Sequence, residues 1–186
     1  MSYTLSLRQR FTVVQNRYDV LRGDGSASVP LAYAQQKRFS LREKIIFYTP
    51  ETSSPAFALT ARNIVDLAGV YDITDAGGNV LATLRKDALA SLARSTFQLE
   101  FPHGSLTGRE RTWWRPIARR VLSAVNELGS LIPIHFDFTD ASGVAVLSVE
   151  RRLAVRDSYR ILVERDDFDW RVAAACAVAV DTLMNR

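Results

Sequence analysis

The sequence predicts a mainly β protein (α+β class) in which a curved sheet wraps around one buried helix. The first observation is residues 172–180, Val-Ala-Ala-Ala-Cys-Ala-Val-Ala-Val, which have no polar face. As a helix this stretch covers about two and a half turns, so it must be enclosed rather than laid on a surface. The second observation is that almost everything before it has the pattern of short strands divided by turn residues. We expect residues 1–186 to form a single domain.

The terminal apolar stretch has two alternative interpretations, a buried strand and a membrane span. Residues 176–180 alternate in size as a strand would, and valine is a mediocre helix former. The alanines favour a helix, and so do the three aspartates within residues 166–169, because carboxylates stabilise a helix N-terminus. A membrane span needs roughly 20 apolar residues, whereas Arg171 and Asp181 bracket only nine.

The composition is ordinary for a globular protein, with 47% hydrophobic and 24% charged residues. The net charge of +4 and the pI of about 9.5 mildly favour anionic partners. Cys176 is the only cysteine, so no internal disulfide can form, and we expect it to be a small buried hydrophobe. Residues 1–8 lack the features of a signal peptide, so we predict a cytoplasmic protein and leave peripheral membrane contact open.

Alternation of apolar and polar residues marks the predicted strands, most clearly in residues 97–101 and 134–138. The other predicted strands are residues 11–15, 31–36, 44–48, 57–62, 70–74, 80–85, 145–151 and 159–163. Clusters of Gly, Asp, Ser and Pro separate them. Strands this short and numerous indicate a barrel or a sandwich.

Two segments of the chain resemble each other, and each predicts a hairpin. Residues 70–78 and 135–143 match at Asp72/Asp137, Thr74/Thr139, Asp75/Asp140, Ala76/Ala141 and Gly78/Gly143. Asp followed by small residues and Gly is typical of a hairpin turn, because Asp caps the turn and Gly supplies a positive φ. We interpret the match as a barrel built from two related parts. Two similar hairpins without a common origin are the alternative.

Residues 109–128 break the strand pattern and predict one extra amphipathic helix near residues 114–128. Its apolar positions recur at helical spacing and are Trp114, Ile117, Val121, Val125 and Leu128.

The basic and aromatic stretch at residues 108–120 is the strongest functional candidate. Tryptophans settle at membrane interfaces, and arginines attract anionic headgroups and bind phosphate with paired donors. The candidate anion-binding residues are Arg109, Arg111, Arg115 and Arg119, together with Arg85, Lys86, Arg151 and Arg152 at the ends of the two related hairpins. Trp113 and Trp114 are candidate membrane or partner contacts. The alternative is that Trp114 packs the helix onto the barrel and that all these basic residues are simply solvated.

Several motifs follow one another in an order that resembles the LURP-one-related family. They lie at residues 33–35 (Tyr-Ala-Gln), 43–45 with Tyr48, 61–62, 75–78, 84–86, 94–97, 149–152, 156–161 and 169–171 (Asp-Trp-Arg) before the apolar tail. The resemblance covers roughly residues 10–185. This family is placed in the Tubby C-terminal-like group, alongside phospholipid scramblases.

The resemblance implies a closed antiparallel barrel of about twelve strands around a central hydrophobic C-terminal helix. It also implies phosphoinositide binding, as in tubby-like members, or lipid movement at membranes, as in scramblases. The chain departs from the pattern at Phe97, where tryptophan is expected, and residues 113–114 have no clear tubby counterpart. The lipid-contacting basic residues of tubby proteins cannot be matched singly, so no site is transferred.

Catalytic chemistry is poorly supplied, and we expect neither enzymatic activity nor a cofactor. His103 and His135 are the only histidines, Cys176 is expected to be buried, and no glycine-rich nucleotide loop opens a helix. Cys and His lack the number and spacing for a metal site. The aspartates at 72, 75, 137 and 140 could supply oxygens to calcium, although turn capping explains them more simply.

The leading prediction is therefore a non-enzymatic barrel that binds anionic phospholipid or phosphoinositide headgroups at a membrane surface. The alternative is a protein-interaction module that uses the exposed Trp/Arg helix. Nucleic-acid binding is less favoured because no recognised motif stands out. Scramblase activity is less favoured because the apolar stretch is short and expected inside the barrel.

Overall fold

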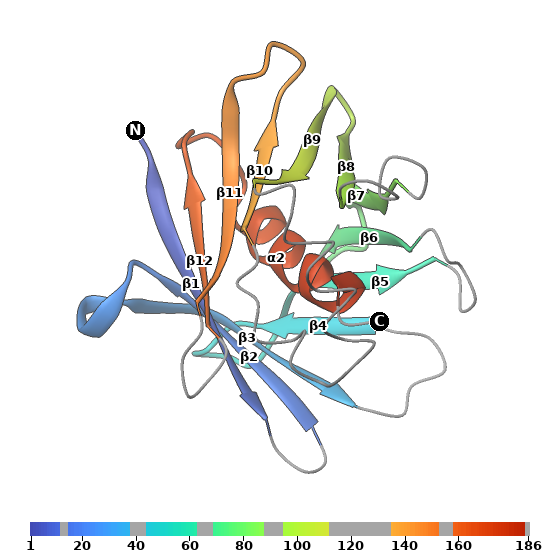
Figure 1. The fold of residues 1–186 in the computed structure, drawn as a ribbon. Helices are drawn as coiled ribbons and strands as arrows, with labels where there is room; N and C mark the ends of the chain where they lie inside the picture. The colour runs from blue at the N-terminus through green and yellow to red at the C-terminus, as the bar shows by residue number, and fades with distance from the viewer. Residues whose placement is uncertain are drawn as a thin grey trace, which may run out of the picture.

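In the described part of the chain, twelve antiparallel strands form a closed barrel around one helix (Figure 1). The computed structural model describes residues 1–11, 15–37, 44–62, 69–87, 95–111, 135–152 and 158–184. The strands are β1 (Tyr3–Phe11), β2 (Gln15–Arg22), β3 (Val29–Lys37), β4 (Lys44–Tyr48), β5 (Pro55–Ala61), β6 (Val70–Asp75), β7 (Val80–Lys86), β8 (Thr96–Phe101), β9 (Gly104–Glu110), β10 (His135–Thr139), β11 (Ala145–Arg152) and β12 (Ser158–Val163). The helix is α2 (Trp170–Met184), and a 3-10 turn, η1 (Gly25–Ala27), links β2 to β3. The mainly β barrel is confirmed, whereas the helix predicted near residues 114–128 lies outside the described residues.

Each strand pairs with the next strand along the chain, and β1 closes the barrel against β12. The closing register runs from Tyr3 opposite Val163 to Arg8 opposite Ser158. Closure gives every described strand a partner on both sides, which limits a common route to aggregation.

The helix α2 fills the space that the strands enclose, as Figure 1 shows. Every residue from Val172 to Val180 is at most 1% exposed, so the predicted buried helix is confirmed. A barrel of this many strands is too wide to be filled by wall side chains alone. The small alanines on α2 leave room for bulky wall residues, which also pack on one another: Phe47 and Phe57 stack at 4.1 Å, and Phe97 meets Phe136 edge-on at 5.1 Å.

Cys176 lies on α2 and is fully buried, in agreement with its predicted role as a small hydrophobe. Burial raises the pKa of its thiol, because the thiolate would lose its hydration. The thiol therefore stays protonated and unreactive.

The last turn of α2 contacts polar groups of the barrel wall. Asp181, which the sequence suggested as the polar limit of the apolar stretch, is only 3% exposed and accepts a short hydrogen bond from the Tyr159 hydroxyl. Lys86 donates from Nζ to the Leu183 carbonyl at 3.3 Å. A cation suits this position because the last carbonyls of a helix carry partial negative charge.

Most predicted strands coincide with observed strands to within a few residues, whereas the predicted strand at residues 11–15 lies mostly outside the described residues. Its ends belong to two different strands, β1 and β2, and residues 12–14 lie outside the described ranges. The strands β1, β2 and β9 were missed. In each, one face is polar or charged and the inward face is carried by few apolar residues, such as Tyr18 and Val20 in β2 and Leu106 in β9.

Candidate functional site

The two related hairpins, β6–β7 and β10–β11, each hold an arginine against an aspartate on the outer wall of the barrel. In the first, Arg62 binds Asp72 with two hydrogen bonds of 2.7 and 2.8 Å, and the Thr83 hydroxyl donates to the same carboxylate at 2.9 Å. We call this trio the first clamp. Partial burial acts to raise the pKa of Asp72, but the bonds from Arg62 and Thr83 outweigh it and hold the pKa below its ordinary value.

The second hairpin repeats this arrangement with different residues. Arg111 binds Asp137 at 2.7 and 2.8 Å, and the Ser148 hydroxyl donates to Asp137 at 2.7 Å. We call this trio the second clamp. Here too burial acts to raise the pKa of Asp137. The hydrogen bonds from Arg111 and Ser148 outweigh this effect, so the pKa of Asp137 is below its ordinary value. His135 lies beside this clamp, with Nε2 3.3 Å from Asp137 Oδ1.

The turns of the two hairpins also match. Asp75 accepts from the backbone N–H of Asn79 at 2.9 Å, and Asp140 accepts from that of Val144 at 3.1 Å. Gly78 and Gly143 have φ of 85° and 83°, a conformation that glycine adopts without strain. The four aspartates considered for calcium thus bind arginines or cap turns.

The predicted basic residues at the hairpin ends do not form one group. The strands that carry them, β7 and β11, are separated by β8, β9 and β10. Each residue also has its own place: Arg85 lies 3.6 Å from Glu100, Lys86 contacts the end of α2, Arg151 is only 6% exposed, and Arg152 binds Asp24 at 2.9 Å. Alternation along a strand already requires that Arg151 and Arg152 face opposite sides of the wall.

The stretch at residues 109–119 is only partly described. Arg109 is exposed on β9, and it makes no ion pair within the ranges that the structure describes. Arg111 is engaged in the second clamp. The other candidates, Trp113, Trp114, Arg115 and Arg119, lie outside the described residues.

A groove of about 280 Å³ on the wall formed by β1, β2 and β3 was not predicted from the sequence. Two exposed arginines, Arg8 and Arg17, line it together with Asp19 and Tyr33. Arg17 donates from Nε to Asp19 at 3.0 Å, and its guanidinium lies 4.9 Å from the centre of the Tyr33 ring. Arg8 donates one bond, of 3.3 Å, to the Gly25 carbonyl. We call this feature the basic groove.

Both arginines of the basic groove retain unused donors. A guanidinium carries five N–H donors, and the contacts above occupy one donor on each residue within the described chain. Arg152 of β11 adds positive charge to the same wall. It and Arg8 of β1 lie on opposite sides of Ser158 of β12, with which both are in register. Arg152 and the neighbouring Arg160 lie 2.9 and 3.9 Å from Asp24, which offsets part of that charge.

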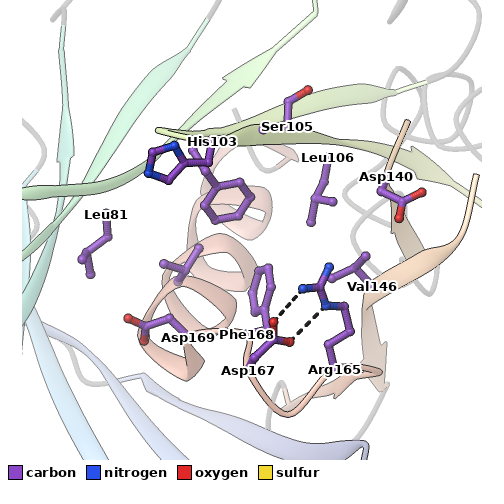
Figure 2. Close-up of a pocket in the computed structure, with 13 residues that line it drawn as sticks. Leu81, His103, Ser105, Leu106, Asp140, Val146, Arg165, Asp167, Phe168 and Asp169 are labelled. Atoms are coloured by element: carbon purple, nitrogen blue, oxygen red, sulfur yellow. Dashed lines mark hydrogen bonds and ion pairs between the residues drawn. The ribbon is translucent and has the colours of Figure 1, made fainter. Parts of the chain in front are cut away.

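A second cavity, of about 420 Å³, lies at the end of the barrel where α2 begins (Figure 2). It opens between the β8–β9 turn and the connection from β12 to α2. Its residues include Leu106, Val146 and Val172 on the apolar side, and Asp140 and Asp167 on the polar side. We call it the mouth pocket.

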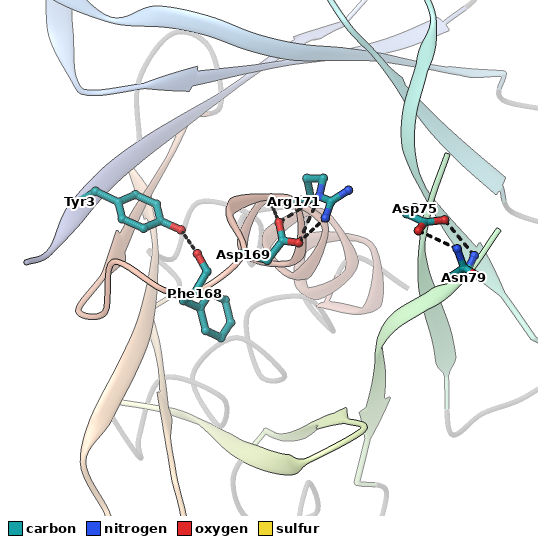
Figure 3. Close-up of polar contacts among 6 residues, drawn as sticks. All are labelled: Tyr3, Asp75, Asn79, Phe168, Asp169 and Arg171. Carbon is teal, nitrogen blue, oxygen red and sulfur yellow. Dashed lines mark hydrogen bonds and ion pairs between the residues drawn. The ribbon is translucent and has the colours of Figure 1, made fainter. Parts of the chain in front are cut away.

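The N-terminus of α2, beside the mouth pocket, is capped by neighbouring side chains (Figure 3). Asp169 caps the helix by accepting from the Arg171 backbone N–H at 2.9 Å, and the Arg171 side chain folds back onto the same carboxylate at 2.6 Å. Tyr3 of β1 donates to the Phe168 carbonyl at 2.6 Å, and burial raises the pKa of Tyr3 to about 12. These contacts fix the connection between β12 and α2 against the wall.

The fold defines the class: a closed antiparallel β-barrel with a helix in its lumen, with a groove on its wall and a pocket at one end. Within the described chain, no helix combines the length and the apolar character that a bilayer span requires. The LURP-one-related family model matches residues 31–181, and the chain belongs to this family. The resemblance seen in the sequence is therefore confirmed. No curated protein matches the chain.

Proposed function

We propose that this barrel is a non-enzymatic protein that binds anionic phospholipid headgroups at a membrane surface, with the basic groove as its main contact. The observation that carries the proposal is that Arg8 and Arg17 flank one depression and keep donors unused. Guanidinium groups bind phosphate oxygens with paired, charge-assisted hydrogen bonds, which is the chemistry that a phospholipid headgroup offers.

The filled lumen favours headgroup binding over uptake of a whole lipid. Residues Ala173 to Ala179 of α2 are fully buried among wall side chains, so an acyl chain would have to displace the helix. For the same reason, lipid movement through the barrel is less favoured than binding on its surface. The net charge of +4 supports attraction to an anionic surface.

The stretch at residues 109–119 supplies a proposed second contact. Arg109, the first residue of this stretch, is exposed on β9. We expect Arg115 and Arg119 to bind headgroups and Trp113 to insert at the interface. Arg111 is omitted because its guanidinium is engaged by Asp137.

Vesicle flotation tests the proposal. The protein is mixed with vesicles of phosphatidylcholine alone, or with added phosphatidylserine or phosphatidylinositol bisphosphate. We expect flotation only with the anionic vesicles. Arg8→Ala and Arg17→Ala should each weaken binding about fivefold, the effect of one basic residue near an anionic surface.

Arg85→Ala is the matched control, because it removes one exposed arginine from a different wall. Equal flotation with neutral and anionic vesicles would contradict the proposal, and so would unchanged binding by the Arg8→Ala/Arg17→Ala double variant. A further variant with Trp113→Ala, Arg115→Ala and Arg119→Ala tests the second contact separately. If only this variant loses binding, the contact lies there and the basic groove has no role.

A further inference from the structure

We propose that the mouth pocket binds a small organic amine with one positive charge and an apolar body. The inference is independent of the headgroup proposal, because the pocket and the basic groove share no lining residue. The volume of about 420 Å³ lies within the usual range for small-molecule sites, about 300–1,000 Å³.

The inner surface of the mouth pocket suits an apolar body. Val146 and Val172 are each 1% exposed and Leu106 is 6% exposed, so they form a fixed floor. Phe101 and Phe168 pack edge-on at 5.7 Å and form a wall beside it. Apolar and aromatic surface of this kind favours an aliphatic or aromatic group displaced from water.

The charged groups of the pocket select the sign of the ligand. Three carboxylates, those of Asp140, Asp167 and Asp169, line it against one guanidinium, that of Arg165. A chain with a net charge of +4 thus places an acidic lining around this cavity. The N-terminus of α2 cannot attract an anion here, because the Asp169 carboxylate already caps it.

Pairing among these groups leaves one carboxylate for the ligand. Arg165 binds Asp167 through two bonds of 3.0 and 2.6 Å, as Figure 2 shows, and Arg171 neutralises Asp169. Asp140 uses Oδ1 for its turn, whereas its Oδ2 has no hydrogen bond to any described residue. The Ser142 hydroxyl, the turn N–H groups and the positive charge of nearby Arg165 lower the pKa of Asp140, so it is ionised at neutral pH. The three aspartates and the two arginines, Arg165 and Arg171, together leave one net negative charge beside an apolar floor, which matches one ammonium group.

Titration with 2-phenylethylamine, followed by amide shifts in NMR spectra, tests the inference. We expect saturable shifts at the Gly104, Val146 and Val172 amides, with a Kd on the order of 1 mM for so small a probe. The neutral alcohol of the same shape should bind at least about tenfold more weakly, since it lacks the charge-assisted bond. Phenylacetate, the anionic analogue, should produce no shifts at these amides.

The chain offers a matched pair of variants for this test. Asp140→Asn should weaken amine binding about tenfold. Asp75→Asn changes the equivalent capping residue of the related β6–β7 turn, outside the pocket, and should leave amine binding unchanged. Equal loss in both variants would contradict the inference, because the effect would then come from hairpin damage. Binding of phenylacetate to the same amides, or the absence of saturable shifts with the amine, would overturn it as well.

Discussion

The β6–β7 and β10–β11 hairpins carry the same clamp on the outer wall but differ in the residues behind it. The clamps are Arg62 with Asp72 and Thr83 of one hairpin, and Arg111 with Asp137 and Ser148 of the other, with bond lengths that agree within 0.2 Å. No pattern in the sequence marked Arg62 as a ligand-binding residue. Because Arg62 and Arg111 occupy equivalent positions, we interpret the Arg111–Asp137 pair as a structural feature of the barrel and not as part of a ligand site.

The interior differs because large and small residues are exchanged between the first strand of each hairpin and the strand that precedes it. Leu59 of β5 faces Ile73 of β6, whereas at the equivalent positions Gly108 of β9 faces Phe138 of β10. A methyl group on Gly108 would lie 2.4 Å from a ring carbon of Phe138. The repeated unit thus keeps its polar bonds, while β10 alone carries the large side chain that β5 and β6 share between them.

The largest effect should come from placing bulk on both β10 and β9, the first strand of the second hairpin and the strand before it. Gly108→Leu should destabilise the protein by about 3 kcal/mol, at the upper end for overpacking, because the Phe138 ring has no space to move within a filled core. Adding Phe138→Ile, which recreates the Leu59–Ile73 pair of β5 and β6, should recover at least half of this loss. Urea unfolding measures both variants. A tolerated single variant, or a double variant no better than the single one, would contradict the exchange.

Breaking the clamps should have the next largest effect. Asp72→Ala and Asp137→Ala should each lower the free energy of unfolding by about 1–2 kcal/mol, the range for charge-assisted bonds reduced by partial exposure. The two losses should agree within about 0.5 kcal/mol and should add in the double variant, since the sites lie on separate hairpins. A large loss in only one hairpin would show that the clamps are not equivalent.

Acid should remove the contribution of both clamps together. The pKa values of Asp72 and Asp137 are lowered by folding from the ordinary value of 3.8, so their stabilisation is present above that pH and is lost as the pH falls through the folded values. The gap in stability between the wild type and Asp72→Asn/Asp137→Asn should be constant at neutral pH. It should close as the pH drops below 3.8. A gap that persists in acid would assign the effect to packing instead.

The smallest effect is expected for an arginine that has an acidic neighbour but no clamp. Arg85 lies 3.6 Å from Glu100, and both side chains are about half exposed. Arg85→Ala should change the free energy of unfolding by less than about 0.5 kcal/mol. A larger loss in urea unfolding would mean that exposed ion pairs on this wall matter as much as the clamps.

The fold could be predicted from the sequence because its two main signals are local. Residues 172–180 have no polar face, which indicates a fully enclosed helix. Segments such as residues 97–101 alternate between apolar and polar side chains, which indicates a strand with one buried face. Asp181 shows where local reasoning fails: it resembles a polar helix end but is buried, because Tyr159, on the preceding strand β12, supplies its partner.

The candidate sites depend on distant pairings and could not be predicted in the same way. Arg111 meets a partner 26 residues along the chain. Arg8 and Arg17 share a groove only because the β1–β2 register sets their strands side by side, and β1 itself was missed. The equivalence of the two hairpins was visible, yet the sequence did not indicate that an arginine before each hairpin would bind its aspartate.

The central claim is that this protein separates its arginines into clamps that hold the barrel and a groove that binds anions. One set of four variants tests it most directly, with unfolding in urea and flotation with anionic vesicles measured on each: Arg62→Ala, Arg111→Ala, Arg8→Ala and Arg17→Ala. We predict that the first two lose stability and keep vesicle binding, whereas the last two keep stability and lose binding. Loss of binding in the clamp variants with no change in the groove variants would contradict the account.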